Sequence, residues 1–333
     1  MPLPVFSGTH KSAGFFWTHK SVTRFTKQAL TIQEQVDQWV DRGLVVTDRT
    51  KAEHFLSVIS YYRLSAYSLP FQLGSNDHRF RLGTTFDDIL NLYSFDRELR
   101  LLVMDAIERL EVALRTQITN HMSVTYNPHW YLDKNLFKAN YNHTLINHIN
   151  TEINRNKEKF LEHYQRKYCN PSLPPSWMVT EILTIGRISK LYENLAKASD
   201  QKRIAQCFKI PSKPLFSWFQ SISYVRNLCA HHSRLWNREL RVTPKIPQSN
   251  IPWVKMPISL DNPSIDPNKR VYFILVVIEY LLQSVNPEST WHWRLRHLLE
   301  KYPKITKASM GMPDDWLNDV FWRFQGEAPT FHS

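Results

Sequence analysis

The fold is decided by the stretch from Thr85 to Asn127, which reads TFDDILNLYSFDRELRLLVMDAIERLEVALRTQITNHMSVTYN. This stretch contains neither Gly nor Pro, and its apolar residues recur every three or four positions from Ile89 to Ile118. Such spacing places them on one face of an α-helix. We therefore predict a single long helix over residues 85–123.

Two pairs of opposite charge lie four residues apart within this helix. They are Asp96 with Arg100 and Glu111 with Arg115. Pairs at this spacing meet on a helix surface and contribute about 0.2–0.5 kcal/mol each where they are exposed.

The rest of the chain continues the pattern of one helix after another, without an alternating strand segment of convincing length. The predicted fold class is therefore all-α. We divide the chain into a basic N-terminal arm (1–30), an N-terminal helical segment (31–82), a helical core (83–302) and a C-terminal tail packed on the core (303–333). The core is expected to hold a basic helical insertion (128–172), a helix over 213–238 and a Pro-rich connection near 244–267.

The composition narrows the class of function. The 333 residues include 42 Lys and Arg against 30 Asp and Glu, a formal charge of +12, which favours nucleic acid as a partner. Only 8 Gly argue against phosphate loops and dinucleotide fingerprints. Three scattered cysteines without a CxxC spacing argue against a disulfide framework and indicate a reducing cytoplasm. The longest apolar run, Val271 to Leu282, is too short to span a membrane and reads as a buried core helix.

The densest polar cluster runs from Ser223 to Arg238 and reads SYVRNLCAHHSRLWNR. On a helix, Asn227 and His231 share a face, and Arg226 lies one step round the same edge. Arg offers a permanent planar charge to phosphate oxygens, and His exchanges protons near neutral pH. The cluster therefore suits phosphodiester cleavage.

A metal site is not expected at this cluster. His231 and His232 are adjacent, so on a helix they point about 100° apart. No Cys/His quartet or HExxH motif completes a ligand set.

The string RNLCAHHSRLWN, from Arg226 to Asn237, resembles the signature of the bacterial abortive-infection proteins of the AbiD/AbiF type, whose core resembles the HEPN ribonuclease fold. Further matches cover roughly residues 30 to 320. They include ISYYRLS at 59–65, YSFDRELR at 93–100, IERLEVALR at 107–115 and MPDDW at 312–316.

This resemblance implies a HEPN-type helical bundle with R-x4-6-H as its catalytic motif. The motif falls on Arg226 and His231, with Asn227 in the usual polar position after the Arg. A second match, R-x5-H, runs from Arg115 to His121. HEPN nucleases build one composite site from two such motifs, either across a dimer or within one chain. Alternatively, Glu111 holds Arg115, and His121 is a surface residue near the end of its helix.

The resemblance also implies an activity. The chain would be an anti-phage toxin that cleaves RNA, using the ribose 2′-hydroxyl as nucleophile and leaving a cyclic phosphate and a 5′-hydroxyl, with no metal or cofactor. His231 would act as general acid or base, Arg226 would stabilise phosphoryl charge, and Asn227 would fix the orientation of the ring. A bound noncoding RNA or another antitoxin would regulate it. The other class of function is a non-catalytic RNA-binding or sensing module, in which Arg226 and His231 only hold helices or grip phosphate.

We expect RNA to contact basic and imidazole side chains in three places. The first set follows the motif, the second lies in the insertion, where a solvated surface is the alternative, and the third lies in the N-terminal arm. In that order the residues are His232, Arg234 and Arg238; Arg155, Lys157, Lys159, Arg166 and Lys167; and Lys11, Lys20, Arg24 and Lys27.

Overall fold

The computed structural model describes residues 26, 28–74, 78–247 and 266–322. Over these ranges the fold is all-α, as predicted, and strand-like pairing is limited to three isolated bridges. The α-helices are α1 (Ile32–Asp41), α2 (Arg49–Ile59), α3 (Tyr61–Ser68), α4 (Phe86–Thr125), α5 (Tyr141–Arg155), α6 (Lys159–Lys167), α7 (Ser176–Ile182), α8 (Ile185–Glu193), α9 (Ala198–Gln206), α10 (Ser212–Ala230), α11 (Val271–Val285) and α12 (Trp291–Lys301).

Helix α4 is the axis of the molecule. It begins at a capping box, in which the Thr85 hydroxyl accepts a hydrogen bond from the backbone N–H of Asp88 and the Asp88 carboxylate accepts one from the backbone N–H of Thr85. Its 40 residues give a rod about 60 Å long at 1.5 Å per residue. The observed bounds lie within two residues of the predicted 85–123.

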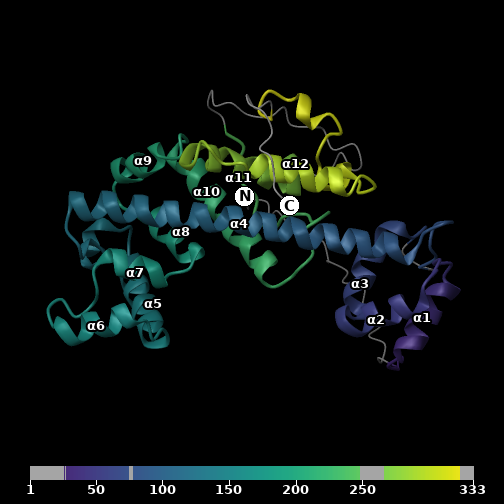
Figure 1. Cartoon of the computed structure of the whole chain (residues 1–333). Coiled ribbons are helices and arrows are strands. Elements are labelled where there is room, and N and C mark those ends of the chain that lie inside the picture. Colours follow the sequence, from purple (N-terminus) through teal and green to yellow (C-terminus); the bar gives the residue numbers. More distant parts are fainter. Residues whose placement is uncertain (1–25, 27, 75–77, 248–265, 323–333) are drawn as a thin grey trace, which may run out of the picture.

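The other helices are arranged along this rod (Figure 1). Helices α1 to α3 gather at its N-terminal end, and α5, α6, α7 and α9 gather at its C-terminal end. Between them α10, α11 and α12 pack against α4. The Trp291 indole at the start of α12 donates to the Leu102 carbonyl at 2.8 Å, which ties α12 to the first half of α4.

Helix α11 is buried from Val271 through Leu282, so the apolar run is a core helix, as predicted. Within the described ranges, none of the helices combines the length and the apolar character that crossing a membrane requires. The described part of the tail, residues 303–322, packs back on the core. Its Trp322 indole donates to the Tyr272 hydroxyl on α11 at 2.9 Å.

Candidate functional site

The predicted helix over 213–238 is wrong at its C-terminal end, because α10 stops at Ala230. His231 follows as the capping residue, and His232 takes a left-handed conformation with φ +55°. The N–H of Ser233 donates to the Leu228 carbonyl, and the N–H of His232 donates to the Cys229 carbonyl. This pair of bonds is a Schellman motif, which usually has Gly where His232 stands.

The chain beyond this turn is fastened to α4. One carboxylate oxygen of Asp96 accepts the backbone N–H groups of Leu235 (3.0 Å) and Trp236 (2.6 Å). The side chains of Leu235 and Trp236 are buried in the core. A tertiary contact of this kind is invisible to helical periodicity, and it competes with continuation of the helix.

Asp96 belongs to a buried polar cluster. Its second oxygen accepts the Tyr67 hydroxyl of α3 at 2.6 Å and an ion-pair hydrogen bond from Arg100. The side chains of Asp96 and Arg100 are 0% and 6% exposed, so this pair is buried and the energy of an exposed pair does not apply to it. Burial raises the pKa of Asp96, although Arg100 and the backbone N–H of Trp236 act in the opposite direction. Burial likewise raises the pKa of Tyr67.

Helix α3 holds the same turn from its other side. Arg63 donates to the His232 carbonyl at 2.7 Å, and Arg234 donates to the Ala66 carbonyl. The segment after His231 is therefore fixed by α3 and α4 together. Sequence reasoning missed this role of Tyr67, Arg63 and Asp96, although Arg63 and Asp96 lie inside strings that carried the family resemblance.

We call the fixed segment from His232 to Trp236 the anchored turn. The candidate catalytic side chains lie just before it in the chain and reach the surface. His231 and Asn227 are exposed, and Arg226 is half-buried. Within the described part of the chain, no carboxylate pairs with Arg226 or His231. The Asn227 amide oxygen accepts a long hydrogen bond from Arg226 (3.5 Å) and does not bond the His231 ring, so the expected orienting contact is not formed. The pair is open to an anionic ligand.

The Cys229 thiol, three residues after Arg226, is not available as a nucleophile. Cys229 is buried on the inner face of α10. Burial raises the pKa of its thiol to about 12, so the sulfur stays protonated at neutral pH and is not a nucleophile.

The second motif has other partners. Arg115 pairs with Glu111, which was the alternative to a catalytic role for Arg115. It also donates to the Leu183 carbonyl at 2.7 Å. The His121 ring makes a 2.9 Å contact through Nε2 with the Asp200 carboxylate on α9.

The two histidines of the motifs are far apart within one chain. Leu235, four residues after His231, is bonded to Asp96, whereas His121 lies 25 residues further along α4, or about 37 Å at 1.5 Å per residue. Four residues of chain span at most about 14 Å, so at least roughly 15 Å separates the backbones of His121 and His231. Figure 1 shows the same separation, with α9 at the C-terminal end of α4 and the end of α10 near its middle.

The predicted RNA-contacting residues fall into three groups. His232 is exposed, whereas Arg234 and Arg238 are half-buried and donate to backbone carbonyls, Arg234 to Ala66 on α3 and Arg238 to Arg234. The five predicted residues of the insertion are all exposed and lie at the end of α5, between α5 and α6, and on α6; they are Arg155, Lys157, Lys159, Arg166 and Lys167. Lys11, Lys20, Arg24 and Lys27 lie outside the described residues.

The described ranges contain no group of three or more His, Cys, Asp and Glu side chains that could hold a metal ion.

Comparison with known proteins identifies the family. No curated protein and no solved structure matches the chain. Residues 54–237 match the model of a family described as Abi-like protein, which covers more than half of the chain and includes the anchored turn, Asp96 and both Arg–His motifs. The chain therefore belongs to the Abi-like protein family.

Proposed function

We propose that the protein is an abortive-infection endoribonuclease of the HEPN type, with Arg226 and His231 as its catalytic pair. Membership of the Abi-like family supports the abortive-infection role. The observation that carries the ribonuclease proposal is the pair at the end of α10, in which His231 is exposed and Arg226 is half-buried. It has no carboxylate partner among the described residues, and a buried cluster fixes the turn that follows it.

The proposed reaction needs only groups of the protein and the RNA. The ribose 2′-oxygen forms a bond to phosphorus as the bond to the 5′-oxygen breaks. One general base takes the 2′-hydroxyl proton, one general acid protonates the leaving 5′-oxygen, and His231 supplies a role of this kind. Arg226 donates to the non-bridging oxygens and stabilises the charge that develops there. The products are a 2′,3′-cyclic phosphate and a 5′-hydroxyl.

The second Arg–His pair of a composite site comes, in this proposal, from a second copy of the chain. His121 stands too far along α4 to join His231 in the same chain. Two copies of the end of α10 would supply two imidazoles, one as base and one as acid.

The homodimer makes a direct prediction for the protein in solution. We expect light scattering to give a molar mass of twice the 39.5 kDa chain. A monomer that cleaves RNA at full rate would contradict this part of the proposal.

The exposed basic surface of α5 and α6 is the proposed place for a regulatory RNA or other antitoxin. Its five Lys and Arg side chains form no ion pair with another described residue. Neutralising phosphates with free cations releases counterions and favours a polyanionic partner.

The nuclease proposal is tested with one oligoribonucleotide and its 2′-O-methyl copy, both incubated with the protein in excess EDTA. We expect the RNA to be cut and the methylated copy to stay intact, because methylation removes the nucleophile. Equal cleavage of the two strands, or cleavage that needs added magnesium, would contradict the proposed mechanism. RNA binding without cleavage would favour the non-catalytic module.

A further inference from the structure

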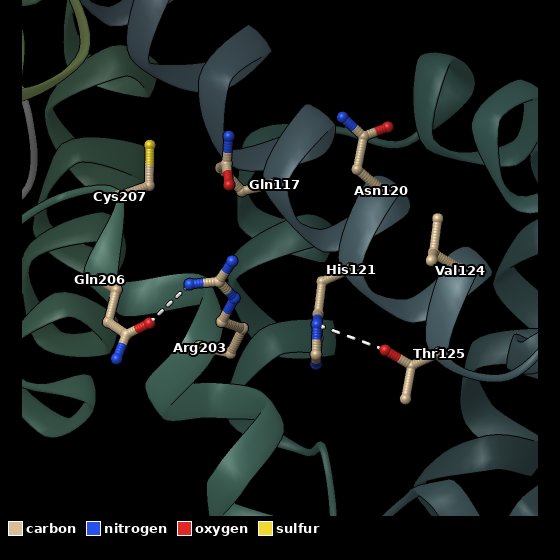
Figure 2. Close-up of a pocket in the computed structure, with 8 residues that line it drawn as sticks. All are labelled: Gln117, Asn120, His121, Val124, Thr125, Arg203, Gln206 and Cys207. Carbon is tan, nitrogen blue, oxygen red and sulfur yellow. Dashed lines mark hydrogen bonds between the residues drawn. The ribbon is translucent and has the colours of Figure 1, made fainter.

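A polar groove lies between the last turns of α4 and helix α9, away from the end of α10 (Figure 2). Its volume of about 630 Å³ falls in the range of small-molecule sites. The lining residues are Gln117, Asn120, His121, Val124 and Thr125 from α4, and Arg203, Gln206 and Cys207 from α9 and its end. This lining contains three primary amides, an imidazole and a guanidinium, and it contains no carboxylate.

Helical spacing brings these side chains to one face of each helix. Gln117, His121 and Thr125 recur every four residues, so the α4 wall extends over two turns, or about 12 Å. Arg203 and Gln206 are three residues apart on α9 and form the opposite wall. Because both walls are helices that pack on each other, the groove is formed before any ligand arrives.

His121 is fixed in this groove by a buried carboxylate. Asp200, whose side chain is 7% exposed, contacts His121 Nε2 at 2.9 Å and accepts the Tyr126 hydroxyl at 2.7 Å. The other ring nitrogen, Nδ1, lies 3.4 Å from the Thr125 hydroxyl on the groove wall (Figure 2). The ring therefore lies between the buried Asp200 carboxylate and the Thr125 hydroxyl on the groove wall.

The other polar groups of the groove retain free hydrogen-bonding capacity. Arg203 donates to the Gln206 amide oxygen at 2.9 Å and forms no ion pair with another described residue. The amides of Gln117 and Asn120 have no hydrogen-bond partner within the described ranges. A guanidinium binds phosphate oxygens through two parallel N–H donors, and a side-chain amide pairs with the edge of a nucleobase through its donor and its acceptor.

We propose that this groove is a nucleotide site, in which Arg203 and His121 hold the phosphate of a nucleoside monophosphate and Gln117 and Asn120 contact its base. The site is independent of the ribonuclease proposed at the end of α10. It gives His121 a role in binding, in place of the catalytic role that its spacing from Arg115 suggested.

The test is isothermal titration of the full chain with the four ribonucleoside 5′-monophosphates, with inorganic phosphate and with an unphosphorylated nucleoside. We expect a mononucleotide to bind at least ten times more tightly than phosphate or nucleoside alone, since only the mononucleotide makes both the phosphate contacts and the base contacts. Equal affinity for phosphate and mononucleotide would overturn the base contact, and no binding of any mononucleotide would overturn the site.

Matched variants test which residues bind the mononucleotide. Arg203→Gln should weaken mononucleotide binding by roughly 10-fold or more, because it removes a charge-assisted pair of hydrogen bonds. Lys202→Gln removes the same charge from the next residue, which is exposed and outside the groove, and should leave the affinity unchanged.

An equal loss of affinity in Arg203→Gln and Lys202→Gln would overturn the assignment, because it would indicate a non-specific effect of charge. Thermal unfolding of each variant separates a folding defect from a binding defect, and Arg203→Lys, which keeps the charge and lacks the planar fork, should recover part of the affinity.

Discussion

Replacement of His231 by alanine is expected to lower the rate of RNA cleavage by roughly 10²–10⁴-fold, the usual contribution of a general acid or base. The imidazole is exposed and makes no side-chain hydrogen bond to another described residue, so its removal leaves no buried group unpaired. We therefore expect the variant to unfold at nearly the temperature of the wild type. The measurement is single-turnover cleavage of a labelled oligoribonucleotide, with a melting curve on the same sample.

His54→Ala is the matched control for this variant. His54 is an exposed histidine on α2 and lies outside the site. The control should cleave RNA at the wild-type rate. If His231→Ala and His54→Ala cleave equally fast, His231 is not a catalytic residue.

Asp96→Ala is expected to destabilise the fold by about 3–5 kcal/mol, the usual cost of removing one partner of a buried ion pair. The substitution leaves the buried Arg100 guanidinium without its counter-charge. It also leaves the N–H groups of Leu235 and Trp236 without their acceptor. Urea unfolding followed by circular dichroism measures the loss of stability.

Asp105→Ala provides the comparison on the same helix. Asp105 also pairs with an Arg four residues later, but its side chain and that of Arg109 are about one-third exposed, and it has a second partner in Arg294. Exposed pairs contribute about 0–1 kcal/mol. Equal destabilisation by the two substitutions would show that burial of the Asp96 cluster does not determine its contribution.

The long helix could be predicted from the sequence because its signals are local. A stretch free of Gly and Pro and an apolar stripe predict α4 to within two residues. The end of α10 could not be predicted in this way. It depends on the left-handed conformation of His232 and on Asp96, which lies 139 residues from Leu235 in the chain.

The candidate site, too, could be predicted only in part, because only its local features are visible in the sequence. Residue type and spacing singled out Arg226 and His231, and both have side chains that reach the surface. Spacing could not show whether Arg115 and His121 reach them, because position along a 40-residue helix decides that distance. Spacing also could not show whether Asp96 and Arg100 form a buried pair or a surface pair, and the structure shows that the pair is buried.

The central claim is that RNA is cut by its own 2′-hydroxyl at Arg226 and His231. The most direct measurement is the mass of the fragments from one oligoribonucleotide cleaved by the wild-type protein in EDTA. The account predicts a 2′,3′-cyclic phosphate on the upstream fragment, or the 3′-phosphate that its hydrolysis gives, and a 5′-hydroxyl on the downstream fragment. A 5′-phosphate on the downstream fragment would contradict it, because water and not the ribose would then be the nucleophile.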